Sequence, residues 1–205
     1  MKRYIRLFAI LIILVLCISG AGASVGMRPY FSGWYAVNLC HPTAGYLEKY
    51  PGDESVRTPF FRTSSSFAID AQLLETVFSF RNGGGMSFGG GFSYVNVSQS
   101  EPWGRSILKP YYGLGLTFDI AYRFSERFAL DLKCRWLFCS FTGSAASFIA
   151  QDIELAPVYT VVAPWALDIA VMLPVTVSLK ADSVSLRAGV GVMIALDSRR
   201  MGGEK

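Results

Sequence analysis

Residues Tyr111–Phe138, YYGLGLTFDIAYRFSERFALDLKCRWLF, contain the most regular pattern in the chain. In the first half of this stretch, every second residue is large and apolar, and the residues between them are small or charged. The apolar positions are Tyr112, Leu114, Leu116, Phe118, Ile120, Tyr122 and Phe124. The intervening positions are Gly113, Gly115, Thr117, Asp119, Ala121 and Arg123. A period of two predicts a β-strand, here with one face that is apolar along its whole length.

The second half of the stretch predicts a return strand with the same alternation. If residues 125–127 form a short turn that pairs Phe124 with Phe128, then Asp119 lies opposite Lys133. The same register places Thr117 opposite Arg135. A shift by two residues would set Asp119 against Asp131, which is unfavourable because the charges are alike. A shift by one would place apolar residues opposite charges. The sequence therefore predicts a hairpin in the first register.

Similar alternation recurs along the chain and predicts eight strands, separated by turns and by two longer loops at 39–62 and 98–109. The predicted strands are 27–38, 64–80, 85–97, 111–124, 128–138, 149–155, 159–179 and 184–196. Residues 160–179 contain one charge, Asp168, and are also long enough for a membrane helix. Pro164, Pro174 and the period of two favour a strand, in which a proline is expected at an end or a bulge.

The apolar faces of these strands indicate which solvent they meet. A soluble antiparallel sheet buries its apolar face and exposes polar residues. Transmembrane barrels show the opposite arrangement, with apolar residues toward lipid and polar or small residues toward the lumen, and the sheet must close because lipid cannot hydrogen-bond an open edge. The predicted fold is an all-β, up-and-down antiparallel transmembrane β-barrel of eight strands. A soluble sandwich or a lipocalin-like cup remains the alternative.

The N-terminus predicts export. Residues 1–23 combine a basic start, an apolar run and small residues, as in a signal peptide, with Ala21 and Ala23 placed for cleavage before Ser24. The barrel is expected over 24–197, followed by a polar tail over 198–205. Removing the leader takes three of the 19 basic residues and no acidic ones, so 16 basic residues face 15 acidic ones. The remaining charge of +1 gives no support for nucleic-acid binding.

The inward positions predict a charged lumen, and the ends of the apolar runs predict aromatic residues at the membrane interfaces. The lumen-facing charged network is predicted to contain Asp119, Arg123, Asp131, Lys133, Arg135, Asp168 and Arg187. The predicted interface aromatics are Trp34, Tyr111, Tyr112, Tyr122, Phe124, Trp136 and Trp165. An eight-stranded barrel has room inside for side chains or one small ligand, so packed charges would block a wide pore.

No catalytic, cofactor or metal site is predicted. The chain has one histidine, His41, which provides neither a Ser-His-Asp triad nor a set of metal ligands. The protein is therefore not expected to be an enzyme.

Three segments, KPYYGLGL, AYRFSERFALDLKCRW and LRAGVGV, resemble strands of small bacterial outer-membrane barrels of the OmpW/OprG and OmpA/OmpX types. The matching positions are Tyr112, Gly113, Gly115, Tyr122, Arg123, Phe124, Arg135 and Trp136. In that family the last strand usually ends in an aromatic residue that the assembly machinery recognises. This chain ends IALDSRRMGGEK and departs from that habit, which leaves its assembly signal open.

The resemblance implies a location in the outer membrane and two possible functions. The first is a narrow channel for small, including hydrophobic, solutes, favoured by small or apolar inward residues at Gly89, Gly91, Ala166, Ala170 and Met172. The alternative is a plugged, non-transporting surface protein, structural or adhesin-like, that interacts with a host. The expected partners are outer-membrane lipid, the barrel-assembly machinery, and a small hydrophobic solute or a host ligand at the extracellular loops.

Overall fold

The computed structural model describes residues 24–42, 64–80, 84–98, 110–180 and 183–198, which form ten β-strands. The strands are β1 (Ser24–Met27), β2 (Tyr30–Pro42), β3 (Ser64–Ser79), β4 (Gly85–Ser98), β5 (Tyr111–Arg123), β6 (Phe128–Phe141), β7 (Ser147–Val162), β8 (Leu167–Met172), β9 (Val175–Leu179) and β10 (Ser183–Leu196). Most of the predicted signal peptide, with Ala21 and Ala23, and the tail after Ser198 lie outside the described residues.

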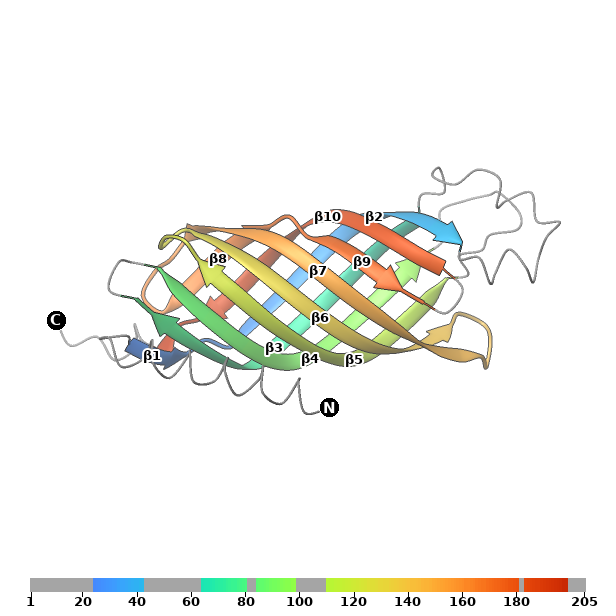
Figure 1. Cartoon of the computed structure of the whole chain (residues 1–205), viewed down its shortest axis with the longest axis horizontal. Coiled ribbons are helices and arrows are strands. Elements are labelled where there is room, and N and C mark those ends of the chain that lie inside the picture. Colours follow the sequence, from blue (N-terminus) through green and yellow to red (C-terminus); the bar gives the residue numbers. More distant parts are fainter. Residues whose placement is uncertain (1–23, 43–63, 81–83, 99–109, 181–182, 199–205) are drawn as a thin grey trace, which may run out of the picture.

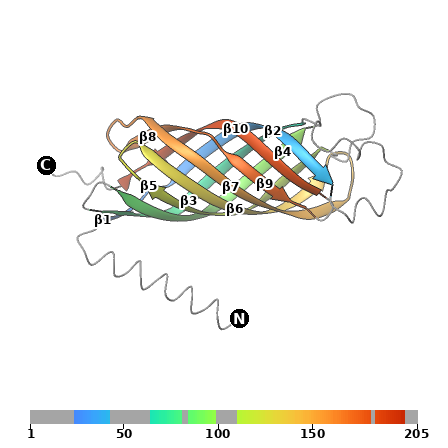
Figure 2. The same ribbon diagram turned by 45° about the horizontal axis from the view of Figure 1, so that its top comes forward.

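The strands form one closed antiparallel sheet (Figures 1 and 2). Neighbours in sequence are neighbours in the ring, and β2 pairs with β10 to close it. Two positions of the ring are each shared by two strands. The short β1 precedes the long β2 along β3, and the short β8 precedes the short β9 between β7 and β10. The ring therefore has eight positions, as the sequence predicts.

The register around the ring sets the size of the barrel. A path that starts at Tyr30 and passes from each residue to its partner on the next strand returns to β2 at Cys40. The shear of the barrel is therefore ten residues. With eight positions and this stagger, the strands tilt by about 40° and the backbone lies about 8 Å from the barrel axis. A tilted strand of 13 residues, such as β2 or β5, then rises about 30 Å along the axis. The interior is just wide enough for side chains.

The β5–β6 hairpin has the register that the sequence predicts, with Asp119 opposite Lys133 and Thr117 opposite Arg135. The turn is tight because the N–H of Phe124 donates to the carbonyl of Phe128 at 2.9 Å. The hydroxyl of Ser125 also accepts a hydrogen bond from the N–H of Phe128 at 3.1 Å. Alternation therefore continues in phase from one strand into the next.

The segment 159–179 differs from the prediction of one long strand. β7 continues through residue 159 to Val162, and the chain turns at Pro164 and Trp165, whose φ is 54°. Pro174 then separates β8 from β9, and its carbonyl accepts a hydrogen bond from the N–H of Gly189 at 3.0 Å. The prolines thus occupy a turn and a break between strands. The helix alternative is wrong for this segment.

A second difference concerns the first long loop. β2 extends to Pro42 and pairs with β10 along its whole length, so residues 39–42 belong to the strand and not to the loop. Residues 43–63 lie outside the described part of the chain. No helix in the described ranges is both long and apolar enough to cross a membrane.

The two faces of the sheet have opposite chemistry. Leu116, Phe118 and Ile120 are between 42% and 49% exposed on the outer face of β5, whereas Thr117 and Asp119 between them are at most 3% exposed. The same contrast runs through β6 and β7, whose outward residues include Leu132 and Ile153. The interior therefore contains charges, and the exterior is apolar.

Candidate functional site

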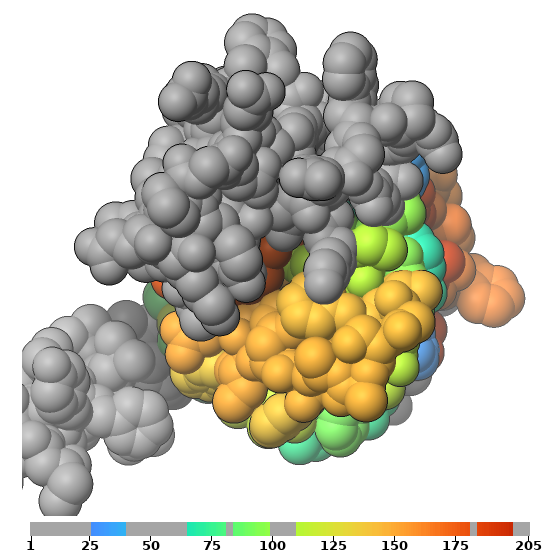
Figure 3. Space-filling view, turned by 90° about the vertical axis from the view of Figure 1, so that its right-hand side faces the viewer, coloured from blue at the N-terminus to red at the C-terminus, as the bar shows by residue number. Residues whose placement is uncertain are grey.

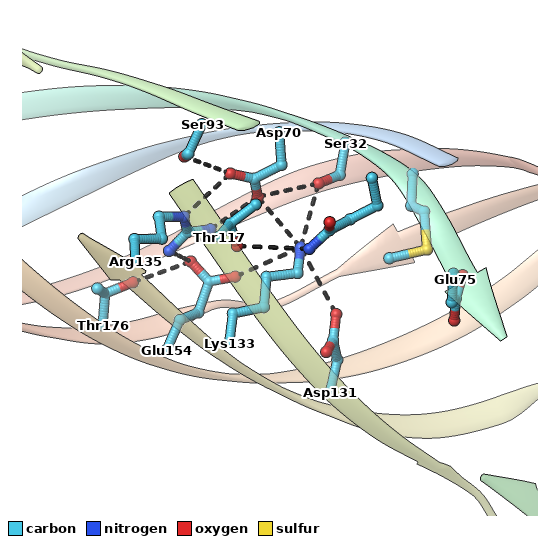
Figure 4. Close-up of polar contacts among 12 residues, drawn as sticks. Ser32, Asp70, Glu75, Ser93, Thr117, Asp131, Lys133, Arg135, Glu154 and Thr176 are labelled. Carbon is cyan, nitrogen blue, oxygen red and sulfur yellow. Dashed lines mark hydrogen bonds and ion pairs between the residues drawn. The ribbon is translucent and has the colours of Figure 1, made fainter. Parts of the chain in front are cut away.

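The centre of the barrel interior is a network of ion pairs around Asp70 on β3 (Figure 4). Arg135 on β6 contacts both carboxylate oxygens, with Nε 2.9 Å from Oδ1 and Nη2 2.7 Å from Oδ2. Lys133 Nζ lies 3.1 Å from Oδ2, and the hydroxyls of Ser93 and Ser32 donate to the same carboxylate at 2.6 and 3.2 Å. Asp70 is fully buried, and both of its oxygens have partners.

The two cations on β6 extend the network toward β7 and β9. Arg135 Nη1 donates to Glu154 Oε2 at 2.9 Å, and the hydroxyl of Thr176 donates to the same oxygen at 3.1 Å. Lys133 Nζ lies 3.5 Å from Asp131 Oδ2 and 3.9 Å from Glu154 Oε1. We call Asp70, Lys133, Arg135 and Glu154 the central network. Its charged side chains are all buried in the lumen.

A smaller group lies toward the end of the barrel where the long connections 43–63 and 99–109 leave the strands. Arg187 Nη1 donates to Asp152 Oδ2 at 2.8 Å, and Nη2 donates to the hydroxyl of Tyr111 at 2.7 Å. The Nζ of Lys180 lies 5.1 Å from the centre of the Tyr111 ring. This end of the interior therefore contains one ion pair and an aromatic ring that contacts two cations.

The opposite end, where short turns connect the strands, contains a pocket lined by Tyr30, Glu75, Asp119 and Asp131, among others. We call these four residues the acidic vestibule. Three arginines, Arg28, Arg123 and Arg127, line the same pocket. Arg28 Nη1 lies 3.6 Å from Glu75 Oε1, and its Nε lies 3.4 Å from Asp168 Oδ2. Both oxygens of Glu75 and both of Asp119 are buried without a hydrogen-bond partner among the described residues. Neither Asp131 Oδ1 nor the Tyr30 hydroxyl has such a partner.

The interior as a whole has more acidic than basic groups. The described, buried charged residues comprise eight carboxylates and four cations, apart from the half-buried Arg123 and Lys180. The acids are Asp70, Glu75, Asp119, Asp131, Asp152, Glu154, Asp168 and Asp197, and the cations are Arg28, Lys133, Arg135 and Arg187. Two of the four cations belong to the central network, Arg28 lines the pocket at the short-turn end, and Arg187 lies toward the other end.

The structure places most of the predicted lumen charges inside the barrel but distributes them over three groups. Asp119, Asp131, Lys133, Arg135, Asp168 and Arg187 are buried, and Arg123 is half-buried. Asp168 and Arg187 do not meet: Asp168 contacts Arg28 at the short-turn end, whereas Arg187 contacts Asp152 toward the other end.

The network predicted from the sequence does not contain Asp70, which is the centre of the observed network, or the lumen charges Arg28, Glu75, Asp152 and Glu154. Asp152 and Glu154 alternate with apolar residues in β7, and this pattern could have identified them. Arg28 precedes Pro29 in the break between β1 and β2, so no alternation marks it.

The prediction of interface aromatics is wrong for Trp34 and Tyr111, which are 3% and 1% exposed and face the lumen. The Trp34 ring lies 5.8 Å from the guanidinium of Arg135, and the Tyr111 hydroxyl binds Arg187. Each has an aromatic neighbour in sequence, and only one of two consecutive strand residues can face outward. The other five predicted aromatics are between 40% and 94% exposed: Tyr112, Tyr122, Phe124, Trp136 and Trp165.

The glycines that favoured an open channel make room for neighbouring groups instead. A Cβ at Gly89 would collide with the carboxylate of Asp119, and a Cβ at Gly91 would collide with the backbone of Ala71 and with Gln72. Ala170 and Met172 are fully buried in the apolar part of the interior. These positions therefore fill the lumen and do not widen it.

No family model matches the sequence, and no curated protein matches it. Among solved structures, two that are similar to this chain are crystal structures of Ail, the attachment invasion locus protein of Yersinia pestis. One of them is a complex with the heparin analogue sucrose octasulfate, at 10% identity and a TM-score of 0.42; the other has 12% identity and a TM-score of 0.44. Each comparison covers 83% of this chain and 99% of Ail. At these values the likeness supports no conclusion on function, and membership of the OmpW/OprG or OmpA/OmpX type stays a prediction.

Proposed function

We propose that the protein is a bacterial outer-membrane β-barrel that does not transport solutes and that anchors its long connections at the cell surface. The observation behind this proposal is the central network, which fills the middle of a narrow barrel whose outer face is apolar. This is the plugged, surface-exposed alternative from the sequence, and it is favoured over the channel.

The outer face supports the membrane location. A closed ring leaves no unpaired strand edge, which is the condition for crossing lipid with strands. The rise of about 30 Å for a 13-residue strand is close to the height of about 25 Å of the apolar band on such barrels. Exposed Phe118, Leu132 and Ile153 would be unfavourable in water and are favourable in lipid.

The connections support an orientation. At one end the strands are joined by short turns, such as 124–127 and 163–166. Figure 3 shows the other end of the barrel, with the β6–β7 turn in yellow and orange. β2 and β4 end there and β3 and β5 begin there, so residues 43–63 and 99–109 connect strands at this end. Outer-membrane barrels have short periplasmic turns and longer extracellular loops. The end in Figure 3 is then the extracellular one, where a host ligand or another surface partner would bind.

The lumen supports a role without transport. Asp70 comes from β3 and Arg135 from β6, which are not neighbours in the ring, so the bonds between them cross the barrel. Arg135 also binds Glu154 on the neighbouring strand β7. Opening a path would break buried ion pairs, and separating the partners of one such pair costs about 3–5 kcal/mol. A rigid, closed barrel is a suitable support for binding loops.

Conductance of planar lipid bilayers tests the absence of transport. We expect the refolded mature chain to show no ion conductance. A variant with both Asp70→Ser and Arg135→Ser should conduct ions, because these two changes together leave the net charge unchanged and remove the bonds across the lumen. The matched control is Glu126→Ser with Arg127→Ser, which removes the same charges from an exposed turn. Steady conductance or solute uptake by the wild-type protein would contradict the proposal and restore the channel.

Surface display is tested on intact bacteria. An epitope inserted within residues 43–63 should bind antibody on whole cells, whereas the same epitope within residues 124–127 should bind only after the outer membrane is permeabilised. The reverse result would contradict the orientation, and a helical far-UV circular dichroism spectrum would contradict the barrel itself.

A further inference from the structure

Carboxyl groups from three strands lie close together in the acidic vestibule. Glu75 on β3, Asp119 on β5 and Asp131 on β6 line one pocket, and each is at most 3% exposed. The pocket has room for about one or two water molecules. Both oxygens of Glu75, both of Asp119 and Oδ1 of Asp131 have no hydrogen-bond partner among the described residues. Negative charge on all three groups at once would be strongly unfavourable in so small a space.

The cations around the pocket are unevenly shared among these acids. Lys133 Nζ lies 3.5 Å from Asp131 Oδ2, and Arg28 Nη1 lies 3.6 Å from Glu75 Oε1. Asp119, by contrast, makes no ion pair within 4.0 Å and no hydrogen bond through its carboxyl group in the described part of the chain. Of the three acids, Asp119 is therefore the one without a counter-charge.

The sheet holds Asp119 between the other two acids. Gly89 on β4 pairs with Glu75 on one side and with Asp119 on the other, and a Cβ at Gly89 would collide with the Asp119 carboxyl group. The glycine therefore leaves the space that this group occupies. Asp131 projects from the next strand of the ring, where it is paired with Ala121.

The titratable groups around Asp119 come from every side of the pocket. They are Arg28 before β2, Tyr30 on β2, Asp70 and Glu75 on β3, Arg123 on β5, Asp131 and Lys133 on β6, and Glu126 and Arg127 in the β5–β6 turn, whereas β4 faces the carboxyl group with Gly89. Arg28 and Lys133 each bind at least two acids. Arg127 is exposed to solvent. The arginines of the pocket thus do not provide Asp119 with a partner of its own.

We infer that the acidic vestibule is a proton-binding site, in which the carboxyl group of Asp119 keeps its proton at neutral pH and donates a hydrogen bond to an oxygen of Glu75 or Asp131. A buried carboxylate without a counter-charge is less stable than the neutral acid, so the neutral form is favoured. The proton turns one oxygen of Asp119 into a donor, and the unpartnered oxygens of its two neighbours are acceptors. A water molecule in the pocket bridges the groups where they do not meet directly.

The bound proton makes the stability of the barrel depend on pH. In the unfolded chain Asp119 is exposed to water, where an aspartic acid loses its proton at about pH 4. Above that pH, and until the folded barrel releases the proton, the folded state binds one proton more than the unfolded state, so stability falls as the pH rises. For this group alone, the equilibrium constant for unfolding rises about tenfold with each pH unit.

The site is independent of the proposed anchoring function, because it lies at the short-turn end and not among the long connections. A barrel that conducts ions could still hold the proton, and a barrel that does not conduct could lack it. The conductance measurement and the measurements below therefore succeed or fail separately.

Infrared spectroscopy of the mature chain, refolded in detergent, tests the site directly. At neutral pH the wild-type protein should show the C=O stretch of a protonated carboxylic acid, and labelling all aspartates with a heavy carbon isotope should shift this band. Asp119→Asn should remove the band. The matched control is Asp152→Asn, which removes a buried acid that is paired with Arg187, and it should leave the band unchanged.

Urea unfolding at a series of pH values tests the effect on stability. Between mildly acidic and neutral pH, the unfolding constant of the wild type should rise about tenfold more per pH unit than that of Asp119→Asn. Asp152→Asn should follow the wild type over this range.

Several outcomes would overturn the site. If the wild type shows no band of a protonated acid at neutral pH, Asp119 is ionised and is stabilised by water or by the arginines of the pocket. A band that Asp119→Asn leaves unchanged, or an equal pH dependence of unfolding in wild type and Asp119→Asn, also contradicts the proposal. Should the variant fail to refold, the labelled wild type decides by itself. Its band must then shift with the label and disappear reversibly as the pH is raised, and a band that does not shift belongs to a glutamate and contradicts the assignment.

Discussion

The central network and the acidic vestibule are neighbours on the same inward faces, yet their electrostatics differ. Along β6 the inward residues are Asp131, Lys133 and Arg135 in succession, so the sign of the charge changes within one step of the strand. Asp70 lies beside the cations and has partners on both oxygens, whereas Asp119 has none. Two equally buried acids are therefore expected to differ in their contribution to stability, because only Asp70 lies within ion-pair distance of the two cations of β6.

The largest expected effect comes from removing the acid at the centre. Asp70→Ala leaves Arg135 and Lys133 buried without their main counter-charge and should lower the free energy of unfolding by about 3–5 kcal/mol. Urea unfolding in lipid vesicles, followed by tryptophan fluorescence, measures it. If Asp119→Ala lowers the free energy of unfolding by the same amount, the central network and the acidic vestibule do not differ in their contribution to stability.

The Arg187 group, with fewer partners, should give an intermediate effect. Arg187→Met removes one hydrogen bond to Tyr111 and leaves Asp152 buried without its cation, so the loss should be about 3 kcal/mol, the low end of the range for a broken buried pair. The same urea titration measures it, with Arg127→Met on the exposed turn as the control for loss of a surface arginine. If Arg187→Met lowers the free energy of unfolding as much as Asp70→Ala does, the number of partners of a charged residue does not determine how much it stabilises the barrel.

Two inward glycines of the sheet differ in what a side chain would meet, backbone at Gly115 and a side chain at Gly89. A Cβ at Gly115 would collide with the backbone of Trp136, which cannot move aside, so Gly115→Ala should cost about 1–3 kcal/mol. Gly89→Ala should cost less, because its Cβ would meet the end of the flexible Asp119 side chain. Thermal unfolding of the two variants in one detergent compares them directly, and an equal loss would contradict the difference in packing.

The smallest effect is expected for Asp119→Asn. The change removes a buried carboxyl group that has no counter-charge, so stability should stay within about 0.5 kcal/mol of wild type or rise. Asp70→Asn, which removes a paired charge, is the matched comparison. A marked loss for Asp119→Asn would mean that the carboxylate has a stabilising partner.

The sequence predicts the fold well because each strand contains its own alternation. The opposition of Asp119 and Lys133 was also predictable, since two consecutive strands joined by a short turn have few possible registers. The role of Asp70 was not, because its partners Lys133 and Arg135 lie on β6, three strands away along the chain. Such contacts depend on how far the strands are shifted relative to one another around the whole closed barrel. The pairing of two neighbouring strands alone does not determine this total shift.

Trp34 and Tyr111 show a second limit of prediction from the sequence. Both occur next to another aromatic residue, so composition alone cannot tell which of the two faces the lumen. The answer depends on Arg135 and Arg187, which are distant in sequence and provide the buried partners of these rings. Likewise, the excess of acids at one end emerges only when all inward positions are placed around the ring.

The pairing of β2 with β10 has a consequence for how the protein is made. Tyr30 pairs with Ala195, so the seam joins the start and the end of the barrel and cannot form until nearly the whole chain has been synthesised. Until then both seam strands present unpaired edges, which are prone to aggregation in water and unsatisfied in lipid. The contacts that close the barrel have the longest sequence separation, so folding is expected to be slow, with closure as its final step. A chain cut before β10 would accordingly lose the whole barrel and not only one strand.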